Sequence, residues 1–393
     1  CRNARYRRNA YLGAYHFPRD KRDAPDKELP RDCRLRVCHI RRLLLCRHMR
    51  VLPLFASDGR EHSCGKCDLL LDFSGDICYN KKIKSDERRT TEMTDRYKPY
   101  PNTNTENELL PPIKRVAALH DISCLGRCAL TVIIPVLSAL GLQTVPLPTA
   151  LLSTHTGGFT DMFFEDLTEQ MKKISRHWQD IDVDFDALYS GFLGSGAQIE
   201  VVSDFIRDFG RKKDGTPAFV AVDPVMGDDG ELYSTYTKEL MLGMSRLCYG
   251  ADLITPNLTE ACFLLGKKYP TEMSADEADG FSRELCRMLH SSFGAKNTVV
   301  TGASGGDTIA TAACDAHGKI SVCRVKKLPL SYPGTGDVFA SVLLGGLLSG
   351  ENLFASSEKA CAFVSYATEF SSHYKTPIRD GLVIEPCLSL LLS

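Results

Sequence analysis

Residues 333–337, with the sequence Pro-Gly-Thr-Gly-Asp, precede an apolar run at 338–348 and have the composition of a phosphate-binding turn at the start of a helix. Glycines allow backbone N–H groups to converge on an anion, and the dipole of the following helix favours negative charge at that point. Asp337, in the first helical turn, could accept a proton from a hydroxyl group that attacks a phosphoryl group. This is the chemistry of a kinase. A solvated loop capped by an aspartate would contain the same short motif, so evidence from other segments is needed to distinguish a kinase site from such a loop.

Four more polar clusters each follow a short apolar segment that has the composition of a buried strand. In doubly wound sheets ligands collect outside the carboxyl ends of the strands, so these clusters should lie close together. Each cluster alone has a structural explanation, because Asn257 or Thr259, for example, could cap the helix that follows. Their joint order along the chain favours a shared site. The clusters are His120-Asp121-Ile122-Ser123, Asp223-Pro224-Val225-Met226-Gly227-Asp228, Thr255-Pro256-Asn257-Leu258-Thr259-Glu260 and Thr301-Gly302.

The elements that must position these clusters alternate between short apolar runs and amphipathic stretches from residue 114 onward. This alternation is typical of βαβ units, and it predicts an α/β fold with a mostly parallel sheet covered on both faces by helices. Ser274 and Glu277 form a capping-box pair, and two alternating runs joined by the turn at 315–318 predict an antiparallel hairpin. The predicted strands are 116–119, 144–151, 187–193, 218–222, 252–255, 298–301, 308–314 and 319–326, and the predicted helices are 129–140, 163–177, 197–212, 237–246, 258–266, 275–290, 337–349 and 356–372.

The first part of the chain differs from the rest in charge and cysteine content. Residues 1–92 carry 22 Lys and Arg against 13 Asp and Glu, a net charge of +9 against −10 for the remainder, and they hold seven of the 16 cysteines. They show no helical or alternating period. Met93 opens a polar leader that ends just before the α/β pattern. We therefore interpret residues 1–112 as an extension without an evolved fold, with Met93 as the natural start, and residues 113–393 as one domain.

Two functional alternatives exist for this extension. Cys64 and Cys67 have the C-x-x-C spacing of a zinc-ligand pair, and further candidate ligands lie upstream at Cys33, Cys38, His39, Cys46 and His48. A zinc site needs two tight pairs, and only one exists. The arginines would also suit an arm that binds nucleic acid, but few aromatic residues lie between them.

Composition limits the class of the whole protein. The chain has 393 residues, 43% hydrophobic and 25% charged, which is compatible with a folded core. No apolar run reaches the roughly 18 to 20 residues of a membrane span, and the start lacks a secretory pattern. The nine cysteines beyond residue 92 are scattered in apolar surroundings, as is typical of a reducing compartment, so we expect a cytoplasmic protein without disulfides there.

Taken together, the motifs resemble the ribokinase-like superfamily and, within it, the pyridoxal/pyridoxamine kinases of vitamin B6 salvage. The resemblance covers about residues 114–393 and none of 1–112. It implies the three-layer α/β/α fold of the superfamily, usually in a homodimer, and a transfer of phosphate from ATP, with Mg2+, to the 5′-hydroxymethyl group of pyridoxal, pyridoxamine or pyridoxine. It implies small-molecule partners, with neither nucleic acid nor membrane. The most specific motifs are Ser153-Thr154-His155-Thr156-Gly157, Ser190-Gly191-Phe192-Leu193-Gly194, residues 223–228, residues 255–260 and Gly334-Thr335-Gly336-Asp337.

The resemblance also implies a role for individual residues. Asp337 matches the catalytic base of the family, and the anion hole corresponds to Gly334, Thr335 and Gly336. The residues that contact the nucleotide and its phosphates correspond to Asp223, Asp228, Asn257, Thr301 and Gly302. The acids linked to the metal correspond to Glu260 and Asp223. The pyridine ring would be held by Ser123, Leu152, Thr156 and Phe192 under a lid that contains Tyr233. Gly302 replaces a hydroxyl-bearing residue, and Phe192 stands where relatives often carry Tyr. His155 lies beside the substrate without transferring the proton. A monovalent cation such as K+ and the preferred vitamer stay open.

Three other functions compete with this interpretation. Hydroxymethylpyrimidine kinase of thiamin synthesis shares the phosphate turn, but its glycine-rich, glutamine-containing segment after the first strand is absent here, where residues 120–128 stand instead. A sugar kinase is disfavoured because no acidic sugar-binding pattern occurs near the start. A protein that binds B6 phosphates without turnover would not need the intact Asp337.

Overall fold

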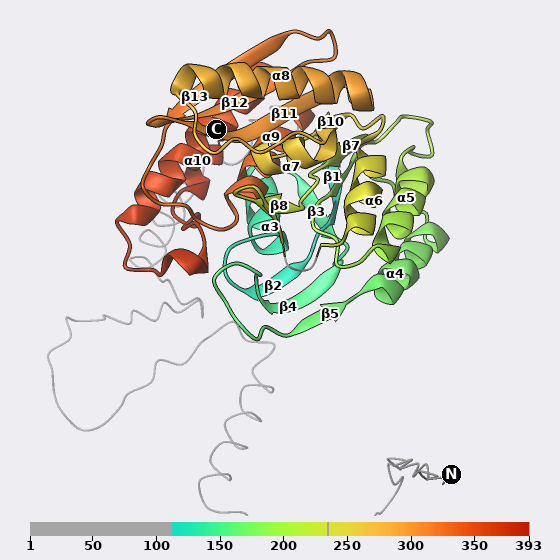
Figure 1. Ribbon diagram of the computed structural model, residues 1–393. Coiled ribbons are helices and arrows are strands. Elements are labelled where there is room, and N and C mark those ends of the chain that lie inside the picture. The colour runs from blue at the N-terminus through green and yellow to red at the C-terminus, as the bar shows by residue number, and fades with distance from the viewer. Residues whose placement is uncertain (1–111, 234–235, 393) are drawn as a thin grey trace, which may run out of the picture. The chain divides into compact units, whose positions relative to one another are not determined.

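The computed structural model describes residues 112–233 and 236–392 (Figure 1). The chain divides into two units, Cys1–Asn104 and Thr105–Ser393, and the following description concerns the second. The predictions on residues 1–111, namely the unfolded extension, the start at Met93, the zinc ligands and the nucleic-acid arm, lie outside the described residues.

The second unit is built on an eight-stranded sheet in the order β13-β12-β11-β10-β7-β6-β1-β3. The strands from β3 to β11 are parallel, and the antiparallel pairs β11–β12 and β12–β13 complete one edge. The β12–β13 pair confirms the predicted hairpin. The strands are β1 (Arg115–Leu119), β3 (Gln143–Pro146), β6 (Ala187–Ser190), β7 (Phe219–Val222), β10 (Leu253–Ile254), β11 (Asn297–Gly305), β12 (Thr308–Cys314) and β13 (Ile320–Lys326).

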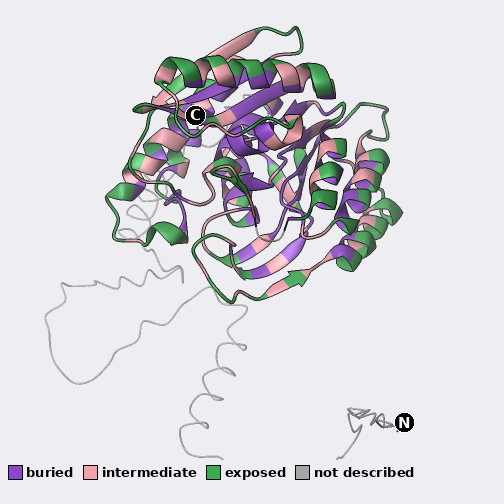
Figure 2. Cartoon of the chain, viewed as in Figure 1, coloured by how far each residue is buried: buried purple, intermediate pink, exposed green. Residues whose placement is uncertain are grey.

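Helices cover both faces of this sheet, which confirms the predicted three-layer arrangement. The apolar side chains of α3, α9 and α10 pack into one core cluster, and those of α4 to α8 pack into another. Figure 2 shows the buried residues along the sheet between the helices. The helices are α3 (Leu130–Ala139), α4 (Thr168–Asp180), α5 (Ala197–Phe209), α6 (Lys238–Cys248), α7 (Leu258–Leu265), α8 (Ala275–Phe293), α9 (Thr335–Leu348) and α10 (Leu353–Ser372). None of the helices in the described residues is long and apolar enough to span a bilayer.

The predicted strand 144–151 is wrong, because this segment forms two strands in different sheets. β3 ends at Pro146, whereas β4 (Ala150–Thr154) belongs to a small sheet with β2 (Ile122–Leu125) and β5 (Phe164–Asp166). Pro146 and Pro148 lack an N–H group and so cannot donate to a continuous ladder. A two-stranded ribbon of β8 (Gly227–Asp228) and β9 (Glu231–Leu232) was also not predicted.

The helix predicted at 163–177 begins only at Thr168. Residues 164–166 pair with β4 as a strand, and the Asp166 carboxylate then accepts a hydrogen bond of 2.7 Å from the backbone N–H of Thr168. The capping box predicted for Ser274 and Glu277 is confirmed at the start of α8. Local capping signals were therefore more reliable than the division between strand and helix.

Candidate active site

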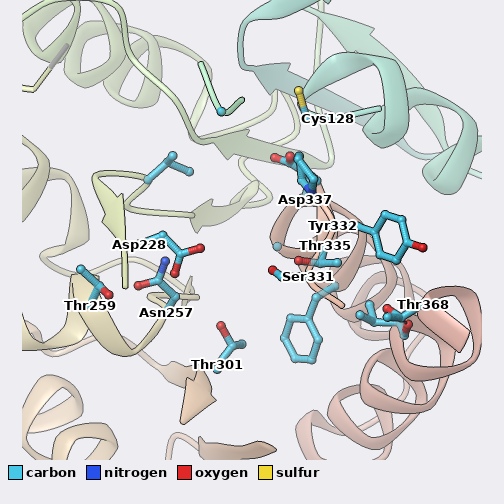
Figure 3. Close-up of a pocket in the computed structure, with 18 of the residues that line it drawn as sticks. Cys128, Asp228, Asn257, Thr259, Thr301, Ser331, Tyr332, Thr335, Asp337 and Thr368 are labelled. Atoms are coloured by element: carbon cyan, nitrogen blue, oxygen red, sulfur yellow. Dashed lines mark hydrogen bonds between the residues drawn. The ribbon is translucent and has the colours of Figure 1, made fainter. Parts of the chain in front are cut away.

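A cavity of about 830 Å3 opens at the carboxyl ends of β1, β7 and β10, a size typical of small-molecule sites. Every residue singled out in the sequence as a site residue lies on its wall. Figure 3 shows Asp337 and Thr335 of α9 on one side, with Asp228, Asn257 and Thr259 on the other. The predicted residues that line the cavity are Ser123, Leu152, Thr156, Phe192, Asp223, Asp228, Tyr233, Asn257, Glu260, Thr301, Gly302, Gly334, Thr335, Gly336 and Asp337.

The phosphate turn depends on close backbone packing. Gly334 precedes α9 with a φ of +83°, and a Cβ atom there would lie 2.0 Å from the carbonyl oxygen of Arg127. Only glycine satisfies both conditions. At Gly336, by contrast, a Cβ atom would meet nothing within 4 Å. The N–H groups of the first turn of α9 lack partners within the helix, so they are free to bind an anion.

Asp337 is oriented by a loop that is distant in sequence. Its Oδ2 atom accepts a hydrogen bond of 2.8 Å from the backbone N–H of Ala129. Ala129 has a φ of +49°, which is unfavourable for a residue other than glycine. Such strain persists only where surrounding contacts enforce it, and it often marks a functional site. The 126–129 loop therefore fixes the direction of the Asp337 carboxylate.

Three carboxyl groups share this end of the cavity. Burial raises the pKa of Asp337 to about 6, although the bond from Ala129 opposes the rise. Burial and the negative charge of Asp337 raise the pKa of Asp121 to about 7, while a 2.9 Å hydrogen bond from the Ser123 hydroxyl lowers it. The pKa of Asp223 is raised by burial and by Asp337. Because burial disfavours ionisation of all three, and the charge of Asp337 adds to this at Asp121 and Asp223, this end of the cavity favours a cation or a proton.

Asp121 is the main residue that sequence reasoning missed. It was noted within the cluster 120–123 but received no role, although it lines the cavity and is only 5% exposed. The sequence feature that could have indicated a role for Asp121 was its position shortly after the predicted first strand. Other lining residues, among them Cys128, Ser331, Tyr332 and Thr368, carried no motif that would have indicated them.

On the opposite wall, Asn257 and Glu260 hold each other in a capping box at the start of α7. Asn257 Oδ1 accepts a 2.9 Å bond from Glu260 N–H, and Glu260 Oε2 accepts a 2.8 Å bond from Asn257 N–H. The other oxygen, Glu260 Oε1, accepts from Met226 N–H at 3.0 Å, and Asn257 Nδ2 donates to the Gly227 carbonyl at 2.8 Å. Both side chains therefore tie α7 to the 223–228 loop. The cap that the sequence allowed for Asn257 is present.

The neighbouring wall is open. Thr301 N–H donates to the Pro256 carbonyl at 3.1 Å, and Gly302, with a φ of +77°, has no atom within 4 Å of the place where a Cβ would lie. The space that a side chain would fill at Gly302 is therefore empty. At the other end Leu152 and Phe192 are buried, and Thr149 Oγ1 donates to the Phe192 carbonyl at 2.8 Å. These residues form an apolar floor on which an aromatic ring could pack.

The acidic residues fit a divalent cation only in combination with a phosphorylated ligand. Within 112–233 and 236–392, no group of three or more His, Cys, Asp or Glu side chains could hold a metal ion. Mg2+, however, commonly takes one or two carboxylates together with phosphate oxygens and water. Burial raises the pKa of both Asp223 and Glu260; the charge of Asp337 adds to the rise at Asp223, and the charge of Asp223 adds to the rise at Glu260. A cation bound between these acids and a phosphate would offset this repulsion.

Comparison with known proteins agrees with this geometry. The phosphomethylpyrimidine kinase family matches residues 134–380. A pyridoxal kinase from Deinococcus radiodurans is 29% identical over 219 residues, which cover 54% of this chain and 72% of that protein. A crystal structure from Bacteroides thetaiotaomicron, named as a phosphomethylpyrimidine kinase and solved with pyridoxal, is 38% identical and superposes with a TM-score of 0.66 over 71% of this chain and 96% of that one.

A pyridoxal kinase structure from Lactobacillus plantarum is 29% identical, with a TM-score of 0.64 over 72% of this chain and 97% of that one. The family match alone spans more than half of the chain. The chain belongs to the phosphomethylpyrimidine kinase family, among the pyridoxal kinases of the ribokinase-like superfamily.

Proposed function

We propose that this chain transfers the terminal phosphoryl group of ATP to the 5′-hydroxymethyl group of pyridoxal, pyridoxamine or pyridoxine. The observation that carries the proposal is that one cavity contains the phosphate turn, the apolar floor of Leu152 and Phe192, and the open wall at Gly302. A planar heterocycle fits the floor, and a nucleotide fits the open wall, so the two reactants can meet in front of Asp337.

In this mechanism Asp337 is the general base. Its carboxylate takes the proton from the 5′-hydroxyl group, the hydroxyl oxygen forms a bond to the γ-phosphorus, and the bond from that phosphorus to the β–γ bridging oxygen breaks, so that ADP leaves. The N–H groups at Thr335 and Gly336 stabilise the charge on the transferred group. One such donor contributes on the order of 3 kcal/mol by analogy with oxyanion holes.

The acidic residues of the nucleotide side would act through a cation. Asp223 would hold Mg2+ together with phosphate oxygens, and the bound ion would neutralise charge on the phosphates. Glu260 suits a supporting role behind Asp223, because both of its oxygens already accept backbone N–H groups. On the same proposal the phosphates contact Asp228, Asn257 and Thr301, and the pyridine ring contacts Ser123 and Thr156 under a lid that contains Tyr233. A monovalent cation such as K+ would assist the reaction.

We also propose a cytoplasmic homodimer. Two exposed apolar side chains support an interface at the small sheet: Leu125 of β2 is 55% exposed, and Phe163, directly before β5, is 56% exposed. Light scattering of the purified full chain should give twice the chain mass, and a Leu125→Glu substitution should lower it to that of one chain. A monomeric wild-type chain would contradict this proposal.

The reaction is tested by a coupled assay of ADP formation with MgATP and one acceptor at a time. We expect the highest kcat/KM for one of the three B6 vitamers and a much lower value for hydroxymethylpyrimidine, the alternative acceptor suggested by the name of the family. Preferred turnover of hydroxymethylpyrimidine would replace the proposal by the thiamin reaction. Binding of pyridoxal without ADP formation would indicate a binder that is not an enzyme.

A further inference from the structure

A segment outside the cavity contacts both of its functional ends. This segment, residues 377–387, is named here the C-terminal strap, and it begins with a short 3-10 turn at Ile378–Asp380. Leu382 and Ile384 are buried in the core cluster of α3, α9 and α10, and Val383 N–H donates to the Ser371 hydroxyl of α10 at 2.9 Å. The strap is therefore anchored to the rigid part of the fold, although none of its residues lines the cavity.

The strap holds the 126–129 loop by several contacts to Arg127. Arg127 N–H donates to the Asp380 carbonyl at 3.0 Å, and the guanidinium Nε pairs with Glu385 at 2.7 Å. Gly381, with a φ of +84°, lies so close that a Cβ atom would be 2.7 Å from the Arg127 carbonyl oxygen. Glycine at this position is what allows the backbones of strap and loop to touch.

The same loop supports the phosphate turn from its other side. The Arg127 carbonyl oxygen is the atom that excludes a side chain at Gly334, and the N–H of Ala129 orients Asp337. Arg127 is thus packed between Gly381 of the strap and Gly334 of the turn. A shift of the strap would move the group that aims the catalytic carboxylate.

A second contact leads from the strap to the substrate end. His155 Nε2 lies 2.5 Å from the Arg379 carbonyl oxygen, and His155 Nδ1 accepts from Gly157 N–H at 3.1 Å. Because a carbonyl only accepts and an N–H only donates, both contacts are satisfied by a neutral ring with its proton on Nε2. The ring thereby ties the strap to the loop that carries Thr156, a cavity residue. Phe159 of this loop also packs under the Arg379 guanidinium, 5.1 Å from the ring centroid.

We propose that the C-terminal strap is a positioning element that sets both ends of the cavity, through Arg127 for phosphoryl transfer and through His155 for the vitamer. This inference rests on the proposed function. His155 is accordingly a positioning residue, and the strap contacts explain why a histidine stands beside the substrate without serving as the base.

The His155 contact is tested by two substitutions that each keep one half of the ring's hydrogen bonding. Gln places an amide donor near the position of Nε2, whereas Asn places an acceptor near that of Nδ1. We expect His155→Asn to raise the KM for pyridoxal roughly tenfold with kcat and the KM for ATP unchanged, and His155→Gln to stay close to wild type. Equal KM values for the two variants, or a wild-type KM in His155→Asn, would overturn the inference. A loss of kcat in both would make His155 a catalytic residue instead.

The Arg127 contact is tested with a pair of glycines. Gly381→Ala adds strain and a clash with Arg127, whereas Gly318→Ala, at the β12–β13 turn with a φ of +77°, adds the strain alone because no atom lies within 4 Å. We expect Gly381→Ala to lower kcat roughly 10- to 100-fold and Gly318→Ala to leave it unchanged. Thermal unfolding verifies that each variant is folded, and if Gly381→Ala is not, Glu385→Gln tests the same contact by a smaller fall in kcat. Wild-type kcat in a folded Gly381→Ala contradicts the inference, whereas an inactive wild-type chain contradicts the proposed function.

Discussion

The two helices that face each other across the cavity both carry an acid at the third residue, yet the acids differ in use. Glu260 is the third residue of α7, and Asp337 is the third residue of α9. Glu260 is tied to the cap residue Asn257 in a reciprocal pair. At α9 the cap residue is Gly334, which has no side chain. The Asp337 carboxylate instead accepts one hydrogen bond from the backbone of a separate loop. The residue at the cap position therefore decides whether the acid stabilises a helix start or stays available for chemistry.

The same difference decides what the helix start can bind. At α7 the side chain of Asn257 accepts the N–H of Glu260, so part of the first turn is already occupied. At α9 no side chain caps the helix. A phosphate can thus replace the missing cap at α9, whereas at α7 it would have to compete with Asn257.

The largest expected effect comes from removing the free acid. Asp337→Asn should lower kcat by about 10²- to 10⁴-fold, because an amide cannot accept the hydroxyl proton. Glu260→Gln is the matched change at the other helix and should lower kcat far less, since Glu260 mainly binds backbone. Steady-state assays with pyridoxal and MgATP measure both. Equal losses in the two variants would mean that the two acids do not differ in role.

The glycine cap is the next most sensitive point. Gly334→Ala places a methyl group 2.0 Å from the Arg127 carbonyl in a backbone conformation that alanine rarely adopts, so we expect loss of turnover by about two orders of magnitude and a lower unfolding temperature. Gly336→Ala meets no atom within 4 Å and should keep the unfolding temperature while raising the KM for ATP. Calorimetry on the two variants measures the effect of backbone strain on the unfolding temperature, and kinetics measures the loss of space for the phosphate. A fully active Gly334→Ala would refute the account of the turn.

The raised pKa values predict opposite pH dependences for activity and stability. Asp337 must be ionised to act as a base, so kcat/KM should fall as the pH drops through about 6. For stability the sign reverses: Asp121 and Asp337 have higher pKa values in the folded state than in the unfolded state, so the ligand-free protein should lose stability as the pH rises through about 6 to 7. Unfolding temperatures between pH 5 and pH 8 test this, with Asp121→Asn expected to flatten the fall. A slope unchanged by Asp121→Asn would speak against repulsion between these carboxyls.

The smallest effect is expected at the occupied helix start. Asn257→Ala removes the cap of α7 and should cost about 1 kcal/mol of unfolding free energy. Denaturant titration measures this cost, and Asn352→Ala, which removes the similar cap of α10 away from the 223–228 loop, is the matched control for helix capping. A change in the KM for ATP in Asn257→Ala alone would add a phosphate contact to its structural role.

Local motifs predicted this site better than they predicted the fold around it. Residues 223–228 and 255–260 were placed together because each follows a strand of one parallel sheet, and strand ends meet at one edge whatever the details of the helices. The turn at 334–337 was recognised by its own glycines and aspartate. The split of 144–151 between two sheets was missed, since apolar periodicity does not indicate which sheet a strand joins. The contact of Arg127 with Gly381 joins residues more than 250 positions apart, and neither residue type suggests it. The proposed role of His155 likewise depends on a contact between residues far apart in sequence, the one with the Arg379 carbonyl.

The central claim is that this cavity phosphorylates the alcohol of a B6 vitamer with Asp337 as the base. One reaction mixture tests it most directly: equal amounts of pyridoxal and hydroxymethylpyrimidine with MgATP, incubated with the wild-type chain or with Asp337→Asn, and analysed by phosphorus NMR. The account predicts pyridoxal 5′-phosphate as the main product of the wild-type chain and almost none from the variant, which should still bind pyridoxal. Phosphorylation of the pyrimidine in preference to pyridoxal, or equal product from both proteins, would contradict it.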